Sequence, residues 1–145
     1  SVLVEQHVGD TIAFLTDLVE SVKSRDMPLE EAVRLIVRAV AEEQEAGGGL
    51  HRAISRVEVL PHSIAQRCQA LHHVLLAKVR QLMAVSPEVT VTDLDCASYL
   101  VFTTVDAAIH GFVTQQMVGV TLASLVGQVS RMIVAYLTAP VVAEG

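Results

Sequence analysis

The residues best placed to do chemistry lie between residues 92 and 118, a stretch that we expect to be helical. Polar side chains recur there at steps of four, three, four and four residues, which places them on one face of a helix. These polar residues are Tyr99, Thr103, Asp106, His110 and Thr114. Polar groups are costly to bury without partners, so a bound small molecule is one interpretation of this polar strip. The alternatives are that Asp106 and His110 pair one turn apart, or that the strip reaches across a dimer interface.

Catalysis and metal binding are both disfavoured by the residue spacing. Asp106 and His110 would act as an acid–base pair only in a pocket with a third group. The sequence contains no nucleophile elbow, phosphate loop or dinucleotide fingerprint. His72 and His73, with His62 and Cys68 nearby, are adjacent on a helix and point about 100° apart, so they do not easily share one ion. We therefore expect no enzyme, no metal and no cofactor.

Composition limits the architecture that holds these residues. The 145 residues, 52% hydrophobic and 18% charged, suit one compact helical domain over residues 1–145 and exclude a disordered chain. The net charge of −6 argues against direct binding of nucleic acid by these residues, because phosphate contacts need clustered cations. Two cysteines are too few for a disulfide framework, which favours a reducing, cytoplasmic location.

Apolar periodicity predicts six helices and no strand, giving an all-α bundle. Pro28 suits the first turn of the second helix, and the glycines at 47–49 end it. Thr92 and Asp95 have the spacing of a capping box at the start of the fifth helix. The helices are expected at about residues 2–24, 28–46, 50–57, 61–84, 92–118 and 121–137.

The last two helices have few charges with which to face water. Residues 92–145 hold four acidic residues and one basic residue, and a helix that is apolar nearly all round is buried on more than one side. We expect a second subunit to cover them, forming a four-helix dimer interface, although the same residues could pack inside one subunit. The expected interface residues are Phe112, Gln116, Leu122, Ala123, Val126, Gly127, Ser130 and Ile133.

A membrane span is a weaker interpretation of the same region. The run from residue 107 to residue 130 has no charged residue and is long enough to cross a bilayer. Polar residues such as His110, Gln115 and Gln128 interrupt it, as does Gly119, and neither a basic cluster nor an aromatic belt flanks it. We expect no membrane contact.

The order of helices, with PLEEAVR at residues 28–34 and LHRAI at residues 50–54, resembles the C-terminal ligand-binding and dimerisation domain of TetR-family transcriptional regulators. The resemblance implies a homodimer that responds to a small-molecule effector, and a repressor as the parent protein. Operator DNA would be bound only by an N-terminal helix-turn-helix domain, to which nothing here corresponds. Residues 2–24 resemble the helix that connects the two domains. The alternative is a stand-alone helical dimerisation or partner-binding module without a ligand.

In such domains the effector pocket lies inside the helical bundle, beside the helix that carries the polar strip. The expected ligand is largely apolar, with one polar end. An inward Arg67 would favour an acidic effector, whereas an outward one is an ordinary surface charge. The candidate ligand-binding residues are His7, Phe14, Leu18, Arg67, His72, Leu76, Met83, Tyr99, Phe102, Thr103, Asp106 and His110.

Overall fold

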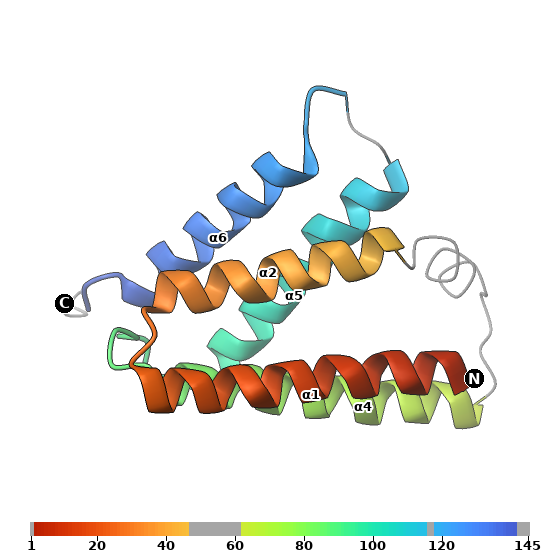
Figure 1. Cartoon of the computed structure of the whole chain (residues 1–145), viewed down its shortest axis with the longest axis horizontal. Coiled ribbons are helices and arrows are strands. Elements are labelled where there is room, and N and C mark those ends of the chain that lie inside the picture. The colour runs from red at the N-terminus through yellow and green to blue at the C-terminus, as the bar shows by residue number, and fades with distance from the viewer. Residues whose placement is uncertain (1, 47–61, 116–117, 142–145) are drawn as a thin grey trace.

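The computed structural model describes residues 2–46, 62–115 and 118–141, and this part of the chain is all-helical (Figure 1). The prediction of an all-α fold is confirmed. The short helix expected at residues 50–57 lies outside the described residues. The helices are α1 (Val2–Arg25), α2 (Leu29–Ala46), α4 (His62–Val85), α5 (Leu94–Gln115) and α6 (Leu122–Thr138).

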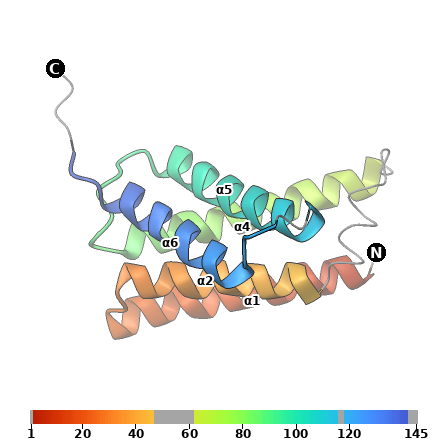
Figure 2. The same ribbon diagram turned by 90° about the horizontal axis from the view of Figure 1, so that it is seen from above.

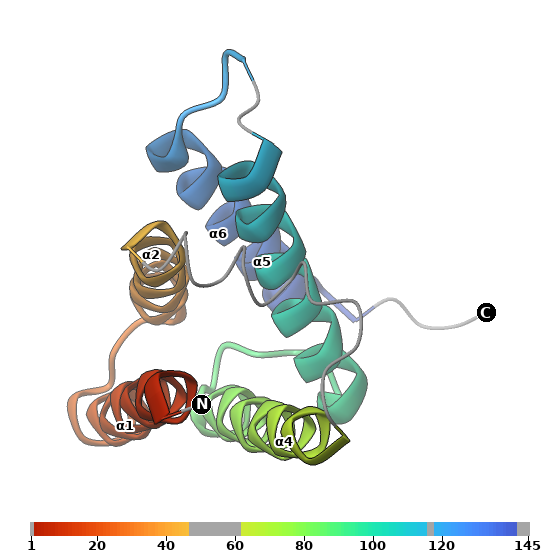
Figure 3. The same cartoon turned by 90° about the vertical axis from the view of Figure 1, so that its right-hand side faces the viewer.

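The helices form two groups with α5 joining them. α1 packs mainly against α4, and Figure 3 shows these two side by side at the base of the molecule. α2 packs mainly against α6, and α5 packs against α4, α2 and α6. Figure 2, from above, shows α6 lying alongside both α2 and α5. The α1–α4 pair is therefore held to the α2–α6 pair chiefly through α5.

In the turn between α1 and α2 one residue has a left-handed backbone conformation, and a carboxylate from another loop accepts a hydrogen bond from the start of α2. Asp26 follows the end of α1 with φ of 53°, a conformation that ends helices. The carbonyl of Pro28 accepts the first bond of α2 from the amide of Ala32 at 3.1 Å. The amide of Leu29 has no acceptor within its own helix and donates to Glu88 Oε2 at 2.7 Å. A residue from the α4–α5 loop therefore satisfies the first amide of α2.

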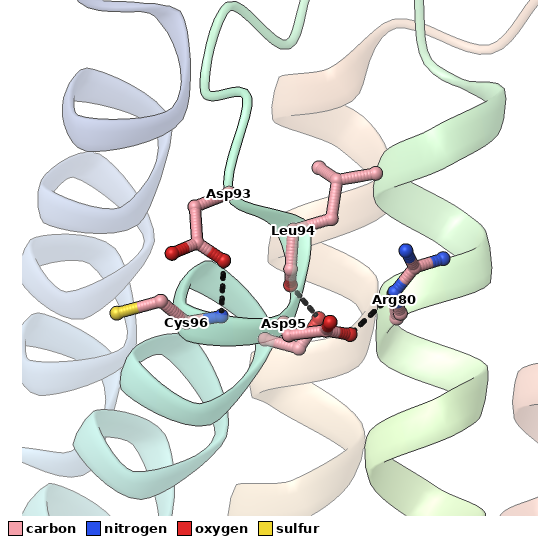
Figure 4. Close-up of polar contacts among 6 residues, drawn as sticks. Arg80, Asp93, Leu94, Asp95 and Cys96 are labelled. Atoms are coloured by element: carbon pink, nitrogen blue, oxygen red, sulfur yellow. Dashed lines mark hydrogen bonds and ion pairs between the residues drawn. The ribbon is translucent and has the colours of Figure 1, made fainter.

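The start of α5 is capped differently from the sequence prediction (Figure 4). Asp93 is the capping residue: its carbonyl accepts from the amide of Ala97 at 3.0 Å, and its Oδ1 accepts from the amide of Cys96 at 3.1 Å. The expected capping box of Thr92 with Asp95 is wrong. Asp95 Oδ1 instead accepts from Arg80 Nε at 2.7 Å, which ties α5 to α4.

A threonine forms hydrogen bonds with the backbone at each end of α6. Thr121 caps the start, and its Oγ1 accepts from the amide of Ser124 at 3.1 Å. At the other end Thr90 donates its amide to the carbonyl of Leu137 at 2.8 Å and its hydroxyl to the carbonyl of Ala139 at 2.5 Å. The loop before α5 thereby fixes the end of α6.

The uncharged run at residues 107–130 is not one helix. α5 ends at Gln115, α6 begins at Leu122, and Gly119 lies between them with φ of 84°. Among the described helices, α5 alone is long and apolar enough to cross a membrane, with a mean hydropathy of 1.3. The core helix of a soluble protein passes the same test, so this is weak evidence for a membrane.

Two buried clusters form the apolar core, and α2 and α4 contribute to both. One buried cluster joins α2, α4, α5 and α6, and includes Val37, Ile109 and Leu137. A second cluster joins α1, α2 and the end of α4, and includes Val19 and Leu82.

The contacts at the start of α5 predict that substitutions of Asp93 and of Arg80 lower the free energy of unfolding by different amounts. Asp93→Ala should lower the free energy of unfolding by about 1 kcal/mol, because the amide of Cys96 at the helix start loses its side-chain acceptor. Arg80→Gln should lower it by less than about 0.5 kcal/mol, because its ion pair with Asp95 is solvent-exposed. Urea denaturation followed by circular dichroism measures both, and equal losses would contradict the assignment of Asp93 as the cap.

Candidate ligand-binding cavity

A cavity of about 450 Å³ lies among all five described helices. This volume falls within the range of pockets that bind small molecules. Its wall is contributed by α1, α2, α4, α5 and α6 in unequal shares, with α2 supplying the most residues. The lining residues are Asp10, Phe14, Leu15, Leu29, Val33, Ile36, Val37, Ala39, Val40, Gln44, Leu75, Val79, Leu82, Met83, Val101, Phe102, Val105, Asp106, Ile133 and Leu137.

Most of the wall is aliphatic and buried. Leu29, Val79, Met83, Ile133 and Leu137 are all buried lining residues, and they come from α2, α4 and α6. Removing an apolar ligand surface from water against such a wall contributes roughly 25 cal/mol per Å². The cavity therefore suits a ligand whose body is hydrocarbon.

The exposed lining residues mark where the cavity meets solvent. Asp10 and Phe14 lie one turn apart on α1, and Phe14 is 39% exposed. Asp106 on α5 is also an exposed lining residue. The wall of the cavity therefore reaches solvent at two carboxylates and an aromatic ring.

One polar side chain of the wall is buried. Gln44 is 8% exposed, and its Nε2 donates to Asp106 Oδ1 at 3.3 Å. Because an ionised carboxylate can only accept hydrogen bonds, this contact directs the Gln44 amide nitrogen toward Asp106. Gln44 Oε1 is then left buried without a hydrogen-bond partner. An unsatisfied buried acceptor destabilises the free protein and can be satisfied by a donor on a ligand.

Four of the expected ligand-binding residues line the cavity: Phe14, Met83, Phe102 and Asp106. The structure brings these four together from α1, α4 and α5. The side chains of His7 and Arg67 lie outside what the structure describes.

Three further candidates from α1 and α4 lie beside the cavity rather than on its wall. Leu18 belongs to the second core cluster, and Leu76 is half-buried. His72 is exposed, and its ring packs edge-on against Phe102 with the centroids 4.5 Å apart and the planes at 64°. His72 therefore supports one lining residue from outside.

The polar strip of α5 turns mostly to the surface. Tyr99 is 60% exposed, and Thr103 and Thr114 are exposed as well, whereas His110 is half-buried. Of the strip, Asp106 lines the cavity. α5 instead turns Ala97, Val105 and Ile109 inward. On a helix that is apolar nearly all round, periodicity does not define which face is inside.

Sequence reasoning missed the contribution of α2. No residue of α2 is among the expected ligand-binding residues, although Val33, Val37 and Val40 on one stripe of this helix all line the cavity. The signal was Gln44, which continues this stripe at the next helical step and places an amide on an otherwise apolar face. A polar residue at a core position needs a hydrogen-bond partner, so Gln44 was the sequence signal for a binding site on this face of α2.

The expected dimer residues are covered to different degrees. Ser130 is 1% exposed, with its hydroxyl donating to the carbonyl of Val126 at 2.7 Å, and Ile133 lines the cavity. These two are therefore internal, because α6 uses them to pack on its own subunit. Ala123 is exposed, and Phe112, Leu122, Val126 and Gly127 are half-buried. The side chain of Gln116 lies outside the described residues.

The described ranges 2–46, 62–115 and 118–141 contain no metal-binding constellation. Within them, no group of three or more His, Cys, Asp or Glu side chains is arranged to hold a metal ion. The cavity brings together two carboxylates, one amide and apolar walls. This arrangement can bind and orient a molecule.

An apolar cavity and a largely uncharged pair of final helices define the class of this chain as an all-helical bundle built around a cavity. The sequence matches the family model of the tetracyclin repressor-like C-terminal domain over residues 28–137. The chain therefore belongs to this TetR-like family, whose members are domains of transcriptional regulators and not enzymes. No curated protein and no solved structure gives a significant match.

The unpartnered amide oxygen leads to a stability prediction. Gln44→Met should leave the free energy of unfolding unchanged or raise it by up to about 1 kcal/mol, because it removes an unsatisfied buried acceptor while filling similar space. Gln69→Met, on the exposed face of α4, is the matched control. Thermal and urea unfolding of both variants tests this, and a loss above about 1 kcal/mol for Gln44→Met would show that the hydrogen bond to Asp106 stabilises the protein by more than the buried oxygen costs.

Proposed function

We propose that this chain is the effector-sensing and dimerisation domain of a TetR-like repressor. A small, largely apolar ligand binds in the cavity and modulates DNA binding by a helix-turn-helix domain joined to α1. The regulator acts in the cytoplasm as a homodimer, and residues 1–145 form its single effector domain. The observation that carries the proposal is the 450 Å³ cavity, apolar except for a polar edge formed by Asp10, Gln44 and Asp106.

The cavity includes residues of the helix that would transmit the signal. Asp10, Phe14 and Leu15 of α1 line it, and the sequence of α1 resembles the helix that connects to the DNA-binding domain. α1 is held mainly by α4 and only slightly by α2. A ligand that binds better to one position of α1 than to another shifts the population toward that position. The separation of two DNA-binding heads changes with it, and half-site spacing on DNA is geometrically strict.

The surface of α5 and α6 supports the dimer. Only 22% of the most apolar stretch of α5 is buried within the chain. On α6, Met132 is 60% exposed and Tyr136 is also exposed. A side chain added at Gly127 would meet nothing within 4 Å, so a second helix has room to approach there. Exposed apolar surface beside small residues is typical of a helix–helix interface.

Filling the cavity should abolish ligand binding. Ala39→Phe places a ring in the α2 wall, so the affinity for the neutral fluorescent probe phenylnaphthylamine should fall by about tenfold or more, in line with the loss of buried apolar contact. Ala77→Phe, on the exposed face of α4 and away from the wall, should bind as the parent chain does. Fluorescence titration provides the measurement. Absence of probe binding to the parent chain would favour a helical module without a ligand.

A bulky charge on α6 should separate the dimer. Gly127→Arg introduces a long cation at the proposed contact, and sedimentation equilibrium at micromolar concentration should then show a monomer where the parent chain is a dimer. Gly9→Arg is a matched control, since a side chain at Gly9 on α1 also meets open space. A parent chain that is monomeric, or a Gly127→Arg variant that stays dimeric, would refute this interface.

A further inference from the structure

The polar edge of the cavity offers hydrogen-bond acceptors. Gln44 Oε1 is a buried acceptor without a partner. Asp106, one of whose oxygens accepts from Gln44, retains further acceptor positions on its carboxylate. Asp10 adds a second carboxylate at the open side. A ligand that carries hydrogen-bond donors is therefore complementary to this edge, and a ligand that carries only acceptors is not.

The charges of the wall have one sign. Among the described lining residues Asp10 and Asp106 are the charged ones, and none is Lys, Arg or His. Two carboxylates repel an anion and attract a cation, and the attraction is stronger next to an apolar wall than in bulk water. Both carboxylates are exposed. The cationic end of a ligand can thus keep part of its hydration while its body enters the cavity.

The aromatic rings of the wall agree with this sign. Phe14 is partly exposed near Asp10, and Phe102 lies one turn before Asp106. The face of an aromatic ring attracts a cation within about 6 Å of its centre. An ammonium group has three donors and no acceptor, so it can donate to both Gln44 and Asp106.

From this geometry we infer that the effector is an apolar cation, with a hydrocarbon or aromatic body inside the cavity and an ammonium-type group between Gln44 and Asp106. This inference rests on the proposed effector function and specifies the chemical class of the ligand. Because Gln44 Oε1 is buried in the free protein, the Gln44 side chain must turn toward the ligand on binding, and the ligand then satisfies this oxygen.

The test uses three probes with one hydrocarbon body and different ends: phenylbutylamine, phenylbutanol and phenylbutyrate. Calorimetric titration of the full chain should show the amine binding about tenfold to a hundredfold more tightly than the alcohol, the range expected for a charge-assisted hydrogen bond. The carboxylate should bind most weakly. Added salt should weaken binding of the amine and leave binding of the alcohol nearly unchanged.

Two substitutions test which side chains cause the preference for the amine over the alcohol. Asp106→Asn and Gln44→Leu should each reduce the preference for the amine over the alcohol by about tenfold. Glu42→Gln is the matched control, because it removes one negative charge from the exposed face of α2 away from the wall. Circular dichroism verifies that each variant is folded, and the salt dependence of the parent chain tests the charge preference without any substitution.

The possible results separate the two proposals. If the alcohol binds as tightly as the amine and Ala39→Phe abolishes both, the cationic class is wrong while effector binding stands. Tighter binding of the carboxylate also overturns the cationic class. If none of the three probes binds, and phenylnaphthylamine does not bind either, the effector function and this inference fail together.

Discussion

The structure depends on how α2 divides its apolar face between packing and lining. Val37 and Ala41 are buried where α2 meets α5 and α6, yet Val33, Val37 and Val40 also face the cavity. Because α2 touches α1 only slightly, the α1–α4 pair is held away from the middle of α2. Glu88 fixes the start of α2 and so keeps this spacing. The cavity is the space that this arrangement leaves.

The sequence predicted the helices better than it predicted their orientation. Apolar stripes and Pro28 located the helices, because periodicity and backbone restriction are local properties. The start of α5 was misassigned because Thr92 and Asp93 are adjacent and both suit a cap. The inner face of α5 was not predictable either. Its outward positions are nearly as apolar as its inward ones, so tertiary packing alone selects Val105 and Ile109 for the core.

The buried amide of Gln44 links stability to recognition. A well-packed core places apolar residues at such positions, and an unsatisfied buried oxygen costs free energy in the empty state. Binding sites commonly retain groups that are satisfied only when a ligand is present. The same side chain holds Asp106 through its amide nitrogen. Gln44 therefore orients an acidic group at the edge of the cavity while its own amide oxygen lacks a hydrogen-bond partner.

α6 forms part of both proposed sites, and this couples them. Ile133 and Leu137 face the cavity, whereas Met132 and Tyr136, their neighbours in sequence, face outward. A rotation or shift of α6 changes both surfaces at once, because packed side chains on one rigid helix move together. Under the proposed function, ligand affinity and dimer affinity are then linked by one free energy, and each must alter the other by the same factor. Under the proposed function, the effector site and the dimer interface therefore use opposite faces of the same helix, α6.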